Sequence, residues 1–263
     1  MSFEWLNENS RKFLESGYLL QGETPEGRIR DICDAAQKRL GLDGFSDKMY
    51  DYMARGFYSL SSPVWSNYGR EDRGLPISCF NSFCEDSIPD ILYTQSEVGV
   101  MSKLGGGASV DLSSLRPRGS EIKNNGKTSG AVHFARLFEQ VTDVVSQGSQ
   151  RRGRVAPYLS LSHPDAEEFL DIARDGNQIQ DVTTGVTVTD EFMESVKRGK
   201  TEEDKRNRRV WAKTLKVRGE IGFPYVFWQG NAARNKPEVY KDKNMTIHSS
   251  NLCCKLNGLA AQV

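Results

Sequence analysis

The chain has 263 residues in which 35 Lys and Arg balance 35 Asp and Glu, so its charge gives no reason to expect nucleic-acid or membrane binding. No apolar run approaches the roughly 18 residues of a membrane helix, and the N-terminal segment lacks the features of a signal peptide. Five cysteines are an odd number and too sparse for a disulfide framework, which predicts a cytoplasmic protein whose cysteines act as thiols.

Residues 1–60 are predicted to be helical. Thr24 is a plausible N-cap, with Pro25 in the first turn of a helix whose apolar residues recur at helical spacing until Gly41 ends it. The helical pattern resumes at residue 45. By contrast, Pro and Gly interrupt residues 61–80, which we expect to be loop and short strand entering a core.

After residue 75 the expected elements alternate in type: strand 108–115, helix 130–146, helix 164–172, strand 182–188 and a strand within 222–232. Ser162 is the expected N-cap of the second of these helices, and Thr189 or Asp190 caps a further one. Segments 116–130 and 146–157 are expected to be loops, and the charge-dense residues 200–209 a solvated connection. This alternation predicts an α/β fold with parallel strand pairing.

Few short motifs point to chemistry. The chain has no Walker loop, no GxGxxG and no HExxH, and its three histidines are more plausibly helix-face or capping residues than metal ligands. The glycines at 105–107 are better explained by a tight turn than by phosphate binding. Cys79 and Cys253, each taken alone, are best interpreted as buried apolar residues.

Several short motifs occur together in a specific order. They are Ser61-Ser62-Pro63, Ser78-Cys79, Asp86-Ser87-Ile88, Leu115–Ser120, Ser146-Gln147-Gly148, Arg151-Arg152-Gly153, Ser162–Asp165 and Asn251-Leu252-Cys253. In this order and spacing the chain resembles the large, catalytic subunit of ribonucleotide reductases, from about Phe13 to Cys253. The resemblance implies the first half of a ten-stranded α/β barrel after a helical N-terminal region.

The resemblance also implies thiyl-radical chemistry on ribonucleoside diphosphates. Cys253 would abstract the ribose 3′-hydrogen, and Cys79 would be one thiol of the pair that supplies two electrons by becoming a disulfide. Asn251 would hydrogen-bond the ribose hydroxyls. The implied substrate-binding residues are Ser62, Ser78, Gly106 and Asn251.

A second implied site binds a nucleoside triphosphate effector (dATP, ATP, dTTP or dGTP) that selects the substrate. Asp86 would contact the effector's ribose and Arg116 its phosphates, since a guanidinium can hold two phosphate oxygens at once. Loops 123–130 and 176–181 would be the two specificity loops. The implied effector-binding residues are Asp86, Ser87, Arg116, Lys123, Asn124, Gly126 and Gln178. Without the resemblance, ordinary surface loops explain these segments.

The sequence departs from the family pattern at several places. Lys255 stands where the family has the glutamate that serves as acid and base, and residues 254–263 resemble nothing in the family. The partner of Cys79 in the reducing pair is absent, and Gln178 and Gln180 replace arginines common in relatives. The N-terminus is too short for the family's ATP-cone.

These departures predict three segments: a helical region 1–60, a first barrel half 61–253 and a foreign tail 254–263. We expect a complementary C-terminal chain encoded by the second piece of a split gene, with an intervening sequence starting at Cys254 as the alternative. Further expected partners are a second copy of the chain, a separate radical-generating diiron or dimanganese subunit (cobalamin being the alternative radical source) and thioredoxin or glutaredoxin acting through the missing half. No metal is expected on this chain. The alternative function is a non-catalytic fragment that binds effectors or dimerises.

Overall fold

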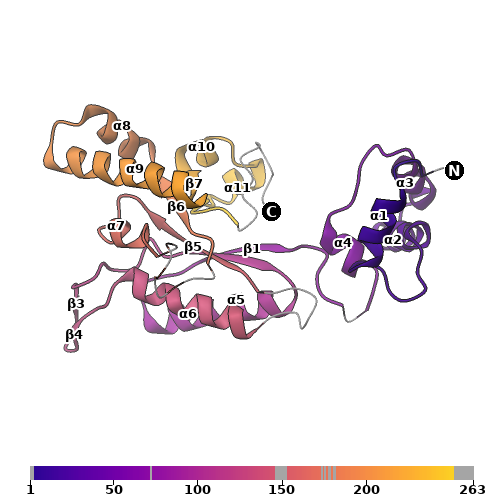
Figure 1. Ribbon diagram of the computed structural model, residues 1–263, viewed down its shortest axis with the longest axis horizontal. Helices are drawn as coiled ribbons and strands as arrows, with labels where there is room; N and C mark the ends of the chain where they lie inside the picture. Colours follow the sequence, from indigo (N-terminus) through magenta and orange to yellow (C-terminus); the bar gives the residue numbers. More distant parts are fainter. Residues whose placement is uncertain are drawn as a thin grey trace. The chain divides into compact units, whose positions relative to one another are not determined.

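The computed structural model describes residues 3–71, 73–145, 153–172, 174, 176, 179 and 182–251. The chain forms two compact units, Met1–Ser78 and Cys79–Val263, and each is described by itself (Figure 1). The predicted tail 254–263 and most of the predicted loop 176–181 lie outside the described residues. Within the described residues, no helix is long and apolar enough to cross a membrane.

The first unit is helical. Its helices are α1 (Glu8–Glu15), α2 (Pro25–Leu40), α3 (Phe45–Ala54) and α4 (Ser62–Asn67). The predicted limits of α2 are confirmed, because the Thr24 hydroxyl accepts the Gly27 N–H at 3.1 Å and Gly41 ends the helix with a φ of 65°. Ile29 and Ile32 on one side of α2 enter the buried core of the unit.

Helix α4 corrects the expectation of loop at 61–80. The buried Arg28 side chain of α2 satisfies carbonyl groups at the C-terminal end of this short helix. The Arg28 guanidinium donates to Trp65 O at 2.9 Å, Val64 O at 3.2 Å and Tyr68 O at 2.7 Å. Burial lowers the pKa of Arg28 to about 10. A cap supplied from another helix leaves no signal in the local sequence.

The second unit is built on a parallel sheet. In the part of the chain that the structure describes, five strands pair in the order β1 (Cys79–Phe83), β2 (Gly107–Asp111), β5 (Val155–Ser160), β6 (Gly185–Val188) and β7 (Tyr225–Trp228). Parallel neighbours require crossover connections, which helices commonly provide. The predicted α/β fold with parallel pairing is therefore confirmed.

The second unit also contains helices, several of which pack on this sheet. They are α5 (Ile88–Lys103), α6 (Ala131–Val144), α7 (Ala166–Phe169), α8 (Asp190–Arg198), α9 (Glu202–Ile221), α10 (Gln229–Arg234) and α11 (Glu238–Asp242). Helix α5 packs on β1 and β2, α6 packs on α5 and β5, and α8 packs on α9. In Figure 1, α5 and α6 lie side by side along the sheet, and α8 and α9 form a second helical pair.

The two faces of the sheet differ in chemistry. Alternate residues of a strand point to opposite faces, and residues paired in register share a face. What we call the polar face carries Cys79, Asn81, Ser109, Asp111, Tyr158, Ser160 and Thr187. What we call the apolar face carries Ala108, Val110, Val155, Leu159, Val186 and Val188, all in the core beneath the helices.

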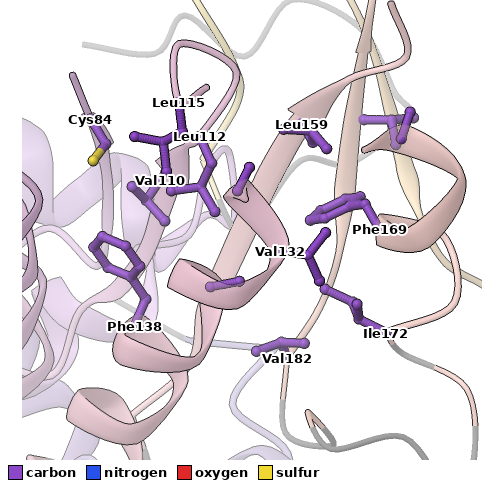
Figure 2. Close-up of a cluster of buried hydrophobic side chains, with 14 of the residues drawn as sticks. Cys84, Val110, Leu112, Leu115, Val132, Phe138, Leu159, Phe169, Ile172 and Val182 are labelled. Atoms are coloured by element: carbon purple, nitrogen blue, oxygen red, sulfur yellow. The ribbon is translucent and has the colours of Figure 1, made fainter. Parts of the chain in front are cut away.

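Helix α6 illustrates the packing on the apolar face. Phe138 is fully buried in the core cluster, and Figure 2 shows it below Val110 of β2. Figure 2 also shows Val132 of α6 beside Phe169 and Ile172. The predicted helix at 130–146 is confirmed, and Val144 at its C-terminal end is 80% exposed.

Strand β5 and the start of α9 are among the elements that the sequence prediction missed. Strand β5 contains Pro157, which lacks the N–H that a central strand normally donates, so the segment resembled loop. The charged run 200–209 is the first half of α9. Thr201 and Asp204 form a capping box, in which the Thr201 hydroxyl accepts from Asp204 N at 3.1 Å and the Asp204 carboxylate accepts from Thr201 N at 3.0 Å.

Smaller corrections concern element limits. The expected loop 116–130 contains a hairpin of β3 (Glu121–Ile122) and β4 (Gly126–Lys127). Helix α7 begins after Asp165 and not after Ser162, and it ends at Phe169. Strands β2 and β6 are shorter than predicted, while Thr189 caps α8 as expected by accepting from Phe192 N at 3.1 Å.

Candidate active site

Strand β1 presents three side chains to the polar face of the sheet. Cys79, Asn81 and Phe83 are alternate residues, and they pair with Gly107, Ser109 and Asp111 of β2. Cys79 is half-buried. The Asn81 amide donates to the Ser109 hydroxyl at 2.9 Å, so the two strands are also joined through their side chains.

A distant segment, residues 248–250, lies along this side of β1. The His248 ring packs against the Phe83 ring with centroids 4.2 Å apart. The Asn81 amide lies 2.8 Å from the Ser249 hydroxyl and 2.9 Å from Ser250 O. The segment therefore runs from Phe83 toward Cys79, and the next residue in the chain is the half-buried Asn251.

The segment is also held from the other edge of the sheet. The Gln229 amide, in the first turn of α10 after β7, donates to His248 O at 2.6 Å. Ser249 and Ser250 are 3% and 0% exposed, so their polar groups depend on protein partners. Contacts from β1 and from α10 thus fix the approach to Asn251.

Asp111 is a buried acid beside this segment. Its carboxylate accepts from Ser113 N at 3.0 Å and from the Ser113 hydroxyl at 2.5 Å. Burial raises the pKa of Asp111, while the Ser113 hydrogen bonds and the nearby His248 oppose that rise. The Ser113 hydroxyl in turn accepts from Ser160 N at 2.8 Å, which links β2 to β5.

The other described cysteines belong to hydrophobic cores. Cys84 follows β1 and is fully buried, and burial raises the pKa of its thiol to about 12. Cys33 lies in the core of the first unit, where burial raises its pKa to about 11. Thiols that ionise so poorly are weak nucleophiles, which fits a packing role for both residues.

The predicted substrate-binding residues fall in different places. Gly106 precedes β2, and a side chain there would meet the Phe80 ring at 2.3 Å, so the tight-turn explanation accounts for this glycine. Ser62 and Ser78 belong to the first unit, and their proposed contacts with substrate stay predictions. Cys253 lies outside the described residues.

The predicted effector residues come together in part. Arg116 Nε donates to the Asp86 carboxylate at 2.6 Å, and its guanidinium donates to Glu121 O at 3.2 Å. This places Asp86 and Arg116 against the β3–β4 hairpin, whose exposed turn holds Lys123, Asn124 and Gly126. The Ser87 hydroxyl caps α5 by accepting from Asp90 N. Gln178 lies outside the described residues.

The turn of this hairpin requires an unusual backbone. Asn124 and Gly126 have φ values of 61° and 80°, which asparagine and glycine tolerate best. Asn125 N donates to Ile122 O at 2.9 Å and closes the turn. The hairpin therefore exposes its turn residues next to the Arg116–Asp86 ion pair.

The Asp165 side chain holds the base of the hairpin. The sequence prediction, which placed Asp165 in the first turn of the helix 164–172, did not indicate this role. Its carboxylate accepts from Arg118 N at 3.0 Å and from Ala131 N at 3.0 Å, at the first residue of α6. His163 holds the same loop, with its Nε2 2.7 Å from Leu115 O. The His163 and Asp165 side chains of the Ser-His-Pro-Asp motif thus hold the loop that leads from Leu115 to the hairpin.

No group of three or more His, Cys, Asp or Glu that could hold a metal ion occurs among the residues described. The site in this part of the chain consists of thiol, amide and hydroxyl groups on a sheet face, with an acid beside them. Such groups can bind and orient a sugar and exchange hydrogen atoms or electrons through sulfur.

Comparisons with known proteins agree with this arrangement. Residues 77–206 match the family model described as ribonucleotide reductase, barrel domain. The chain is similar to the ribonucleoside-diphosphate reductase large subunit of Invertebrate iridescent virus 6, at 30% identity over 94% of this chain and 27% of the relative. A vitamin B12-dependent ribonucleoside-diphosphate reductase of Mycobacterium tuberculosis (strain CDC 1551 / Oshkosh) is 36% identical over 52% of this chain and 20% of that protein.

A solved structure is similar over nearly the whole chain. It is the Actinobacillus ureae class Id ribonucleotide reductase alpha subunit, which matches with a TM-score of 0.87 and 51% identity over 96% of this chain. This chain covers 46% of that subunit, so it spans less than half the length of these relatives.

The parallel α/β sheet with a thiol on its polar face and the match over 77–206 identify part of a barrel domain of the ribonucleotide reductase type. The chain belongs to the ribonucleotide reductase large-subunit family.

Proposed function

We propose that this chain is the N-terminal part of a ribonucleotide reductase catalytic subunit, which converts ribonucleoside diphosphates to deoxyribonucleotides by thiyl-radical chemistry. The observation that carries the proposal is the path of residues 248–250 along β1 toward Cys79. This path brings Asn251 toward the strand that bears Cys79, and Cys253 follows Asn251 by two residues in the sequence.

In the proposed reaction each group has one task. A thiyl radical on Cys253 takes the 3′-hydrogen of the ribose, and the 2′-hydroxyl then leaves as water. Cys79 and a second thiol beyond the present sequence lose two electrons and two protons and form a disulfide. Asn251 orients the ribose hydroxyls, while Ser62, Ser78 and Gly106 remain the other proposed substrate-binding residues.

Regulation is proposed to act through the hairpin. Asp86 and Arg116 are joined within hydrogen-bonding distance, and Arg116 reaches the β3 backbone. A nucleoside triphosphate that shares the Arg116 guanidinium with Asp86 would order Lys123, Asn124 and Gly126 around its phosphates. Ser87 and Gln178 complete the proposed effector set.

The remaining strands of the barrel, the second reducing thiol and the acid that Lys255 does not supply would come from the rest of the catalytic subunit. We propose a separate diiron or dimanganese subunit as the radical source, with cobalamin as the alternative. One relative is described as a vitamin B12-dependent reductase, which supports cobalamin as the alternative. Thioredoxin or glutaredoxin would reduce the disulfide.

The test combines this chain with the rest of a catalytic subunit and with each radical source in turn, and measures deoxyribonucleotide by chromatography. Product is expected with one source, and Cys253→Ser should abolish it. Product that survives this substitution would contradict the proposal. Effector binding without product from any source would favour the alternative, a non-catalytic effector-binding or dimerisation fragment.

A further inference from the structure

Asn81 occupies an unusual position for an amide side chain. It lies on edge strand β1, two residues after Cys79 and on the same face of the sheet. Its Nδ2 group has three acceptors within 2.9 Å: the Ser109 hydroxyl on β2, the Ser249 hydroxyl and the Ser250 carbonyl oxygen. One side chain thus joins two strands to a segment 168 residues away in sequence.

The groups that Asn81 joins are also held by other contacts. The Ser109 hydroxyl donates to Phe80 O at 3.2 Å, which fixes its orientation on the sheet. The far end of the segment is tied to α10 through Gln229 and to Phe83 through the His248 ring. Asn81 therefore belongs to a series of side-chain contacts that runs along β1 toward Cys79.

We propose that Asn81 is a positioning residue, which sets the distance between Cys79 and the segment that carries Asn251 and Cys253. Its proposed task is carried out through Ser109, Ser249 and Ser250 and not on the substrate itself. This inference rests on the proposed function, because it assigns a task within the same site. Fixing Ser250 beside β1 also fixes the starting point of the chain that leads through Asn251 to Cys253.

The chemistry of the contact makes amide identity essential. The acceptor at Ser250 is a carbonyl oxygen, which only a donor can satisfy, and Ser250 is fully buried. Leucine has a similar size but no hydrogen-bond donor. Aspartate has a similar shape, but its carboxylate oxygen would face the Ser250 carbonyl oxygen without a hydrogen between them. A role in packing would tolerate both substitutions, whereas a positioning role would tolerate neither.

The first test uses the full chain and hydrogen exchange read by mass spectrometry. In Asn81→Leu and Asn81→Asp, the peptide that covers residues 246–252 should exchange at least about tenfold faster, the change expected for a lost hydrogen bond to a buried acceptor. Peptides from β2 and β5 should be unchanged. Ser82→Ala, on the opposite face of the same strand, is the matched control.

The second test traps the two thiols in the full chain that carries Cys254→Ser. Diamide oxidises Cys79 and Cys253 to one disulfide by taking up their two protons and two electrons, and peptide mapping measures its rate of formation. We expect trapping in the chain with Asn81 intact, and about tenfold slower trapping in Asn81→Leu. Ser249→Ala, which removes one of the three acceptors, should slow it less.

Equal trapping rates in the parent chain and in Asn81→Leu, or no trapping at all in the parent chain, would overturn the inference. If Asn81→Leu loses protection throughout the sheet, the milder Ser249→Ala variant decides the question by exchange at residues 246–252 alone. Neither measurement requires turnover. A failed reductase assay with the expected trapping would therefore refute the proposed function alone, and normal turnover by Asn81→Leu would refute the positioning role alone.

Discussion

The apolar and polar faces of the same sheet differ in what they do for the protein. The apolar face carries small and branched aliphatic residues, and helices bury it in one core. The polar face buries hydroxyl and carboxyl groups that contribute little hydrophobic free energy, such as those of Ser109, Asp111 and Thr187. Stability therefore comes mainly from one face, while the other holds the groups that chemistry needs.

The largest expected effect tests the apolar face. Phe138→Ala should lower the free energy of unfolding by about 3–5 kcal/mol, because it leaves a cavity beneath β2. Val144→Ala, on the same helix but 80% exposed, should change it by less than about 0.5 kcal/mol. Urea denaturation measures both. Equal losses in the two variants would show that this face does not carry the stability.

A glycine on the polar face provides the second test. A side chain at Gly185 would meet the Tyr158 ring at 2.3 Å, so Gly185→Ala should destabilise the protein by about 1–3 kcal/mol. Gly219 lies in α9 with open space around it, and Gly219→Ala should stabilise by about 0.5–1 kcal/mol. Thermal unfolding should therefore move in opposite directions, and a shift of the same sign would contradict the packing described.

A smaller effect concerns a buried hydroxyl. Thr187 Oγ1 on β6 has no hydrogen-bond partner among the described residues. Thr187→Val keeps the shape and removes this group, so it should stabilise by about 1 kcal/mol. Denaturant unfolding checks the sign. A loss of stability would mean that the hydroxyl is satisfied in the native protein.

The smallest expected effect is a pH dependence at Asp111. Burial raises its pKa above the ordinary 3.8, so the folded chain keeps a proton that the unfolded chain releases. The unfolding free energy contributed by this group is therefore highest below the unfolded pKa, and it falls as pH rises through the folded pKa. In Asp111→Asn this fall should disappear.

Denaturation from about pH 4 to about pH 7 compares the two chains, the interval in which a raised carboxyl pKa is felt. The parent should lose stability relative to Asp111→Asn as pH rises. Parallel curves would show that the folded and unfolded pKa values of Asp111 do not differ.

Elements set by local residues could be predicted from the sequence, whereas elements that depend on distant contacts or carry unusual residues could not. Helix α2 was predictable because Thr24, Pro25 and Gly41 act locally. Strand β5 was not predictable, because Pro157 is unusual in a central strand. The start of α9 was not predicted either, because its many charged residues were interpreted as a solvated connection despite the Thr201–Asp204 capping box.

Sequence reasoning could name some residues of the candidate site, but it could not say which contacts hold them in place. Cys79 and Asn251 follow from the family motifs, but Asn81 carries no motif, and its partners are 28 and more residues away. Its spacing of two from Cys79 was the available signal, since it predicts a shared sheet face. Which distant segment meets that face depends on long-range packing, which the local pattern does not encode.

The most direct test compares Cys79, the first residue of β1, with Cys84, which directly follows that strand. Cys79 lies on the polar face and Cys84 in the apolar core, where burial raises its pKa to about 12. The measurement is deoxyribonucleotide formation by the assembled reductase carrying Cys79→Ala or Cys84→Ala. We predict that Cys79→Ala abolishes turnover and that Cys84→Ala retains it with lower stability. Turnover that persists without the Cys79 thiol would contradict the account.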